Sequence, residues 1–112
     1  MNAKIDLKLT NESLAIITAT LAAVYNTKAL TRRHKSTLSI AIDTVSKLDS
    51  RCANVKVKMD LFNAKTKTKI TLKYHEADML ELLLIQEIAK VDDNYIRLKI
   101  QTVIDDLSQK LC

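Results

Sequence analysis

The side chains best suited to chemistry in this sequence are two histidines and two cysteines. His34 and His75 are 41 positions apart, and neither has a partner ligand at position i+4, so the spacing of a histidine metal site is missing. Cys52 continues an apolar helical pattern and Cys112 is the last residue, and neither has a histidine nearby to act as a base. We expect both cysteines to be reduced, and we predict no metal ligand, no cofactor and no catalytic residue.

The nearest approach to a cluster of metal-ligating side chains is His75, Glu76 and Asp78. This group lies at the predicted start of a helix, where acidic side chains interact favourably with the helix dipole. The acid pairs at 92–93 and 105–106 are adjacent in sequence, so on a helix or turn their side chains point in different directions. We interpret these residues as helix caps and surface charges, and we predict that the protein is not an enzyme.

The chain of 112 residues contains no glycine and no proline. Phosphate-cradling loops of the Walker and dinucleotide-binding types require glycine, so the composition excludes those nucleotide-binding classes. The length suits one domain with its own core, and we predict a single domain over residues 1–112.

The charge is unevenly distributed along the chain. Residues 1–75 contain fourteen basic residues and five acids, whereas residues 76–112 contain four basic residues and eight acids. This asymmetry favours an acidic partner or head-to-tail self-association.

No segment resembles a membrane-directed sequence. Residues 1–10 alternate polar and apolar side chains and lack the continuous apolar stretch of a signal peptide. Residues 79–89 are strongly apolar, but the stretch is short and contains Glu81 and Glu87. We therefore expect an intracellular, soluble (cytoplasmic) protein with no membrane partner.

Two segments share one pattern: KIDLKLTNESL at 4–14 and KITLKYHEADM at 69–79. In each, three apolar residues alternate with polar ones, which is typical of a half-buried strand. A polar cluster then opens an apolar helical pattern, with Thr10 or Asn11 as the expected cap in the first copy and His75 in the second. The sequence thus predicts an internal repeat in which a helix follows a strand.

A second helix follows in each copy. The first helices are predicted at about 11–25 and 76–91, and apolar residues then recur at helical spacing. Either Asp92 or Asp93 is the expected cap of the last helix. We predict two pseudo-repeats of about 1–53 and 54–112. The recurring apolar residues are Leu38, Ala41, Val45, Leu48 and Cys52, and then Ile96, Ile100, Val103, Leu107 and Leu111.

The two copies differ in length. The offset is 65 from Ile5 to Ile70 in the strands, but 58 from Val45 to Val103 in the second helices. The first copy therefore has about seven additional residues, in or near 26–35. Because this segment carries four positive charges and loops often carry function, it is a candidate contact site.

Residues 54–62, NVKVKMDLF, alternate in the same way and predict a third strand, followed by a hairpin loop with Asn63 at positive φ. The predicted fold class is α+β, with a small, three-stranded, mainly antiparallel sheet packed on four helices in the order β-αα-β-β-αα. If a local two-fold axis relates the copies, strands 4–9 and 66–74 are antiparallel neighbours and strand 54–62 lies at an edge.

Lysines dominate the polar side of each predicted strand, most clearly in KTKTKITLKY at residues 65–74. Such a face can contact the phosphates of nucleic acid or another polyanion. The alternative is a solvated surface that keeps the sheet edges from aggregating. No aromatic residue falls within the lysine rows, which argues against base stacking. The candidate contact residues on the strands are Lys4, Lys8, Lys56, Lys58, Lys67, Lys69 and Lys73.

A second basic candidate is TRRHKS at 31–36, where Arg32, Arg33 and Lys35 begin the second helix of the first copy. The tight turn of a helix-turn-helix motif is missing before it. Contact with phosphate or carboxylate groups is one interpretation, and a solvated helix face is the other.

The leading functional expectation is a non-enzymatic structural or protein-interaction module that acts in an oligomer or larger assembly. The bias toward Lys, Ile, Asn and Thr is typical of AT-rich coding sequences and favours a virus or phage assembly component, with the virion as an alternative location. The rival expectation is a sequence-nonspecific nucleic-acid-binding or architectural protein that uses a lysine-rich sheet face. Protein partners or self-association are expected, and a small-molecule substrate is not.

Overall fold

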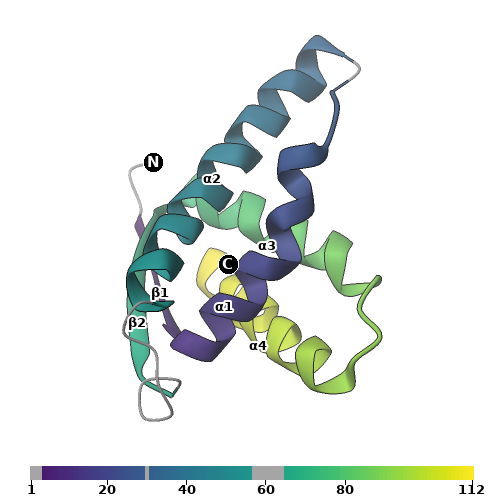
Figure 1. Cartoon of the computed structure of the whole chain (residues 1–112). Helices are drawn as coiled ribbons and strands as arrows, with labels where there is room; N and C mark the ends of the chain where they lie inside the picture. Colours follow the sequence, from purple (N-terminus) through teal and green to yellow (C-terminus); the bar gives the residue numbers. More distant parts are fainter. Residues whose placement is uncertain (1–3, 30, 57–64) are drawn as a thin grey trace.

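The computed structural model describes residues 4–29, 31–56 and 65–112, with residues 54–56 as backbone only. A strand followed by two helices occurs twice along the chain (Figure 1), as the sequence predicts. The fold class is α+β, with four α-helices. The elements are β1 Lys4–Thr10, α1 Asn11–Thr20, the 3₁₀ helix η1 Leu21–Asn26, α2 Arg32–Lys56, β2 Lys67–Lys73, α3 Tyr74–Ile88 and α4 Asn94–Leu111.

The prediction of a three-stranded sheet is wrong. The described residues form a two-stranded antiparallel sheet of β1 and β2. Residues 54–56, which were expected to begin the third strand, continue α2 to Lys56. Each residue added to an existing helix gains a hydrogen bond without a new nucleation cost, and a short polar and apolar alternation does not outweigh that gain. Residues 57–62 of the predicted strand, and Asn63, lie outside the described residues.

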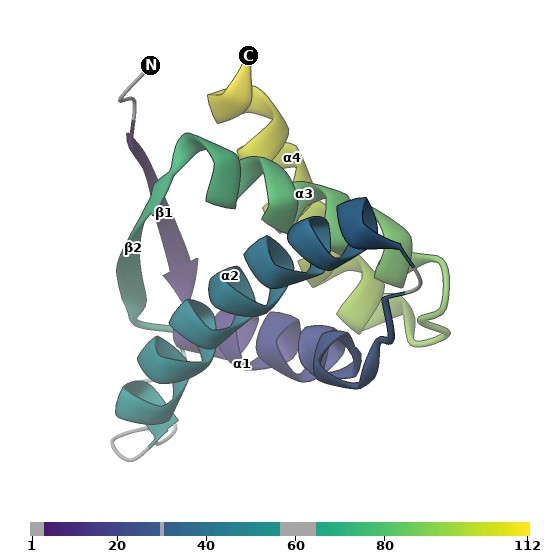
Figure 2. The same cartoon turned by 90° about the horizontal axis from the view of Figure 1, so that it is seen from above.

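The antiparallel pairing of the other two strands is confirmed. Leu7 lies opposite Ile70, and Lys8 lies opposite Lys69. Apolar side chains of both strands point to one side of the sheet, where all four helices gather (Figures 1 and 2). The buried strand residues are Ile5, Leu7, Leu9, Ile70 and Leu72.

The core lies between that side of the sheet and the helices. Each helix contributes side chains that are fully removed from solvent, because apolar residues recur on one face at helical spacing. Within the described residues, no helix combines the length and the apolarity that crossing a membrane would require. The fully buried helix residues include Leu14, Ile17, Leu21, Val45, Leu48, Leu80, Leu84, Ile100 and Leu107.

Side-chain caps form at two of the helix starts, in each case at one of the two residues that the sequence left open. Thr10 Oγ1 accepts a hydrogen bond from the Ser13 N–H at 3.1 Å, at the start of α1. Asp93 Oδ1 accepts one from the Ile96 N–H at 3.0 Å, at the start of α4. Both caps satisfy N–H groups that the first helical turn leaves without a partner.

The third start differs from the prediction. Helix α3 begins at Tyr74, and His75 lies within its first turn and is not its cap. The reason is Glu76, whose Oε1 accepts a hydrogen bond from the Lys73 N–H at 2.8 Å. This bond makes Lys73 the cap, so the helix begins two residues earlier than predicted. The strand alternation placed Tyr74 on the buried side of the sheet together with Ile70 and Leu72. As the first residue of α3, its side chain is instead 40% exposed.

Burial gives a different alignment of the repeats from the sequence pattern. The strands Lys4–Thr10 and Lys67–Lys73 correspond at an offset of 63. The buried stripes of α2 and α4 correspond at an offset of 59, because Ala41 and Val45 match Ile100 and Ile104. The excess in the first copy is thus four residues, not seven. Most of it lengthens the start of α2, where nine residues precede the first buried one, against six in α4.

Candidate functional site

The exposed side of the sheet carries the basic residues that the sequence predicted for these two strands. Their alternation with buried apolar residues places every one of them on this side. We call this surface the lysine face. Its residues are Lys4, Asp6, Lys8 and Thr10 on β1 with Lys67, Lys69, Thr71 and Lys73 on β2.

The register sets lysines directly opposite one another: Lys4 faces Lys73, and Lys8 faces Lys69. The Asn11 N–H donates to the Thr66 carbonyl at 2.9 Å and continues the ladder, so odd-numbered residues of β1 form the hydrogen-bonded pairs. The lysine face therefore consists of non-hydrogen-bonded pairs, whose side chains approach more closely. Like charges opposite each other destabilise a sheet, so this face concentrates positive charge at a local cost.

One carboxylate lies in the middle of the lysine face. Thr71 Oγ1 donates to Asp6 Oδ1 at 2.8 Å, and Lys69 Nζ lies 3.5 Å from Asp6 Oδ2. The Thr71 hydrogen bond holds the pKa of Asp6 below its ordinary value, against a slight desolvation that raises it, and the charges of Lys69 and Lys110 add to the lowering. Asp6 thus stays ionised and offsets part of the charge of the face.

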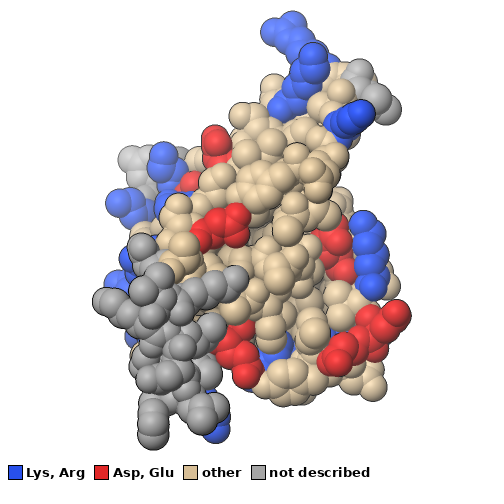
Figure 3. Space-filling view, in the orientation of Figure 1, with Lys and Arg blue, Asp and Glu red and all other residues tan. Residues whose placement is uncertain are grey.

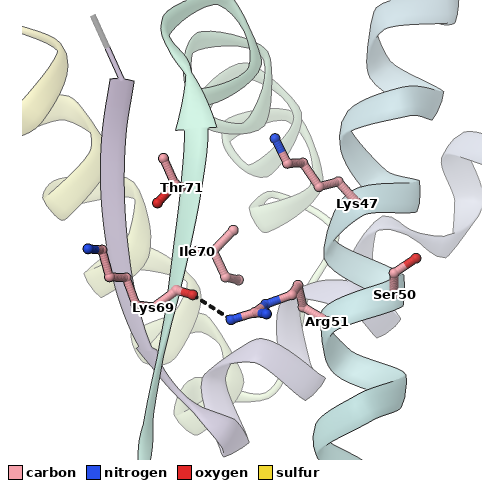
Figure 4. A pocket seen from close by; sticks show the side chains of 6 residues that line it. All are labelled: Lys47, Ser50, Arg51, Lys69, Ile70 and Thr71. Carbon is pink, nitrogen blue, oxygen red and sulfur yellow. Dashed lines mark hydrogen bonds between the residues drawn. The ribbon is translucent and has the colours of Figure 1, made fainter.

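A basic side chain from a neighbouring helix contacts each edge of the sheet that the described residues form. On the β2 edge, Arg51 of α2 donates from Nη2 to the Lys69 carbonyl at 2.8 Å (Figure 4). On the β1 edge, Lys110 of α4 donates from Nζ to the Asp6 carbonyl at 2.6 Å. These contacts are equivalent in the two repeats, because Asp6 and Lys69 are 63 apart and Arg51 and Lys110 are 59 apart. Both occupy carbonyls that an unprotected edge would offer to another strand.

Each edge also borders a basic hollow. The hollow at the β2 edge has a volume of about 430 Å³, and Lys47 and Arg51 extend from α2 toward β2 beside it (Figure 4). The hollow at the β1 edge has a volume of about 500 Å³. The first is lined by Lys47, Ser50, Arg51, Lys69, Ile70 and Thr71, and the second by Lys4, Ile5, Asp6, Lys8 and Lys110. Three basic side chains therefore line each hollow.

The second predicted basic site lies elsewhere. Arg32, Arg33 and Lys35 are exposed on the first turn of α2, and we call this group the basic tip. Figure 3 shows basic side chains at the end of α2 that is farthest from the sheet, separate from those beside the sheet. The structure therefore does not bring the two basic sites together. The Lys56 side chain and Lys58 lie outside what the structure describes.

The histidines and cysteines lie apart from the lysine face. His34 and His75 are exposed in the first turns of α2 and α3. Cys52 is buried and accepts the Thr18 hydroxyl at 3.3 Å, whereas Cys112 is exposed, and both thiols are free. Across residues 4–29, 31–56 and 65–112, no group of three or more His, Cys, Asp or Glu side chains could hold a metal ion.

Sequence reasoning missed Lys47, Arg51 and Lys110 as parts of the site. Arg51 and Lys110 each directly precede the last apolar residue of a helical stripe, Cys52 or Leu111. That shared position could have marked them as equivalent residues at the margin of the core. Only the packing of α2 and α4 beside the sheet shows that they reach the strand edges.

No protein-family model, no curated protein and no solved structure matches this chain.

Proposed function

We propose that the protein is a non-enzymatic nucleic-acid-binding or architectural protein that uses the lysine face. The observation that carries this proposal is the cross-strand pairing of like charges, Lys4 with Lys73 and Lys8 with Lys69. A phosphate placed between two ammonium groups converts their repulsion into two attractions, and counterions released from the nucleic acid add to the affinity. A surface that only needed to be soluble would gain stability from alternating signs at these positions.

Phosphate contact, rather than base stacking, suits the chemistry of this face. The tyrosines that the structure describes lie on helices, and their hydroxyls donate elsewhere. Tyr25 donates to Asp49, Tyr74 to the Leu111 carbonyl and Tyr95 to Glu12. Because the described residues of this face include no aromatic side chain for stacking, its affinity comes from the phosphates and depends strongly on salt.

Fluorescence anisotropy with labelled oligonucleotides at several salt concentrations tests the proposal. We expect affinity to fall steeply with the logarithm of the salt concentration. The double variant Lys67→Glu with Lys69→Glu should weaken binding at least about tenfold at low salt, because two attractions become repulsions.

The basic tip offers a matched control. Arg32→Glu with Arg33→Glu changes the net charge by the same amount. When both double variants are compared at about 0.1 M salt, where the Debye length is about 10 Å, this control should leave affinity within about twofold. Equal losses in both variants would show that binding follows net charge alone and not the lysine face. A wild-type protein that binds no oligonucleotide even at low salt would refute the proposal.

A second candidate function is a structural or protein-interaction module in an oligomer or larger assembly, and one feature of α3 favours it. Leu82 and Ile85 are 46% and 48% exposed, and Ala89 is exposed on the same side of the helix. Their spacing of three and four residues makes a stripe instead of scattered single residues. Either role suits an intracellular, soluble protein, and this second one also suits a virion component.

Analytical ultracentrifugation tests the second candidate. Ile85→Asp should reduce the sedimentation coefficient of an assembled wild-type protein to that of the monomer, whereas Gln86→Asp, one residue away, should not. A wild-type protein that is monomeric at high concentration would count against self-assembly. This measurement is independent of nucleic-acid binding, so the two functions can succeed or fail separately.

A further inference from the structure

We infer that the sheet of β1 and β2 lies in the major groove of duplex DNA, with its two edge hollows on the phosphates of the two DNA strands. This inference rests on the proposed function. The inference goes beyond the proposed function by naming the form of nucleic acid, the groove, and the residues at each edge of the sheet.

The first argument is the two-sided placement of basic residues. One hollow lies on the β2 edge with Lys47 and Arg51, and the other lies on the β1 edge with Lys8 and Lys110. The equivalent contacts of Arg51 and Lys110 to strand carbonyls place these margins in corresponding positions of the repeat. A single nucleic-acid strand would need only one such row of basic residues. Two rows beside a central ribbon match the two backbones that border a groove.

The second argument is size. Two paired strands lie about 4.8 Å apart, and the major groove of B-form DNA is about 12 Å wide and admits a two-stranded ribbon. The helices lie on the buried side of the sheet (Figure 2), so they do not stand between the lysine face and a DNA groove. The major groove of an RNA duplex is too deep and narrow to accept such a ribbon, which favours DNA.

The third argument is charge density. Duplex DNA carries one phosphate charge per about 1.7 Å of its axis, about twice the density of one of its strands. A face without an aromatic platform gains little from unstacked bases, so its affinity follows charge and favours the duplex.

The first experiment compares three labelled ligands of one 20-nucleotide sequence: duplex DNA, the same single DNA strand and the RNA duplex. We expect the DNA duplex to bind at least about tenfold more tightly than the others at equal salt. Binding of the single strand or the RNA duplex with equal or higher affinity would overturn the inference and leave the proposed function intact. Absence of binding to all three would instead remove the proposed function.

The second experiment tests the two margins with equal charge changes. Lys47→Gln with Arg51→Gln alters the β2 margin, and Lys4→Gln with Lys8→Gln alters the β1 margin. Each should reduce the slope of log affinity against log salt by about 1.8, since each removes two phosphate contacts. The tip variant Arg32→Gln with Arg33→Gln should leave the slope unchanged. An effect confined to one margin would contradict contact with two backbones.

The third experiment asks which groove is used. Duplex DNA with glucosylated hydroxymethylcytosine, whose sugars fill the major groove, should bind at least about tenfold more weakly than the same unmodified duplex. Netropsin, which occupies the minor groove, should leave binding to the unmodified duplex unchanged. The reverse pattern, or no effect of glucosylation, would overturn the placement in the major groove. Circular dichroism and thermal melting of each variant confirm that it is folded.

Discussion

The lysine face and the basic tip both place positive charge where the local structure disfavours it, but they are supported differently. On the lysine face, Lys8 is opposite Lys69, and like charges in that position destabilise the strand pair. At the tip, Arg32 and Arg33 begin α2, whose first turn contains no acid, at the positive end of the helix dipole. The face is fixed by buried strand residues beneath it, whereas the tip is an exposed helical turn far from the sheet (Figure 1).

This difference shows why counting charges does not locate a binding surface. The pairing of β1 with β2 fixes the backbone positions of the face lysines in two parallel rows on one side of the sheet. The basic residues of the tip follow one another on a single helical turn, so their side chains leave the helix in several directions. The face therefore presents its charges to one partner surface, although both groups carry several basic residues.

The largest expected effect comes from removing the support beneath the face. Leu72 is fully buried on β2, and Leu72→Ala should lower the free energy of unfolding by about 2–5 kcal/mol, because it leaves a cavity in the core. Ile40 of α2 is 38% exposed, so Ile40→Ala should cost less than about 1 kcal/mol. Urea unfolding followed by circular dichroism measures both. Equal losses of stability in the two variants would contradict the view that core packing supports the lysine face more strongly than it supports the part of α2 near the tip.

A smaller effect should appear at the junction of β2 and α3. Burial raises the pKa of Glu76, but its bonds to the Lys73 N–H and the Lys47 ammonium outweigh that effect and hold the pKa below its ordinary value of 4.5. Because the unfolded chain binds this proton more readily, the stabilisation is present above pH 4.5 and is lost as the pH falls through the folded pKa.

Glu76→Ala should therefore cost about 0.5–2 kcal/mol at neutral pH, the range for loss of a helix cap, and progressively less in acid. Glu76→Gln keeps an acceptor for the Lys73 N–H and should lose less stability than Glu76→Ala. Urea unfolding from pH 7 to pH 3 measures these differences. A constant difference between wild type and Glu76→Ala across that range would show that ionisation of Glu76 contributes nothing.

The smallest effects come from the unfavourable charges themselves. Lys8→Glu places an acid opposite Lys69 and should raise the free energy of unfolding by about 0.2–1 kcal/mol. Arg33→Glu places an acid at the start of α2 and should raise it by about 0.3–1 kcal/mol. Nucleic-acid affinity should separate the two variants, falling for Lys8→Glu and remaining unchanged for Arg33→Glu. A loss of stability in Lys8→Glu would show that the lysine pairs carry no cost.

The candidate site was partly predictable because strand residues alternate between two sides. Lys4, Lys8 and Lys69 could be assigned to one exposed surface from their parity relative to Ile5 and Ile70 alone. Arg51 could not be assigned, because its link to Lys69 is made through the packing of α2 and leaves no periodic pattern in the sequence.

Local patterns in the sequence determined the helices and strands that the structure shares with the prediction, and they narrowed the caps of α1 and α4 to two candidates each. With an assumed two-fold axis they also predicted that β1 and β2 are antiparallel neighbours. Those features depend on alternation, helical spacing and contacts between residues close in the chain. Only the tertiary structure decided that α2 continues through residues 54–56, that the repeats align at 63 and 59, and that Arg51 and Lys110 reach opposite sheet edges. The physical reason is that these outcomes depend on competition between packing arrangements of distant segments, which no local period encodes.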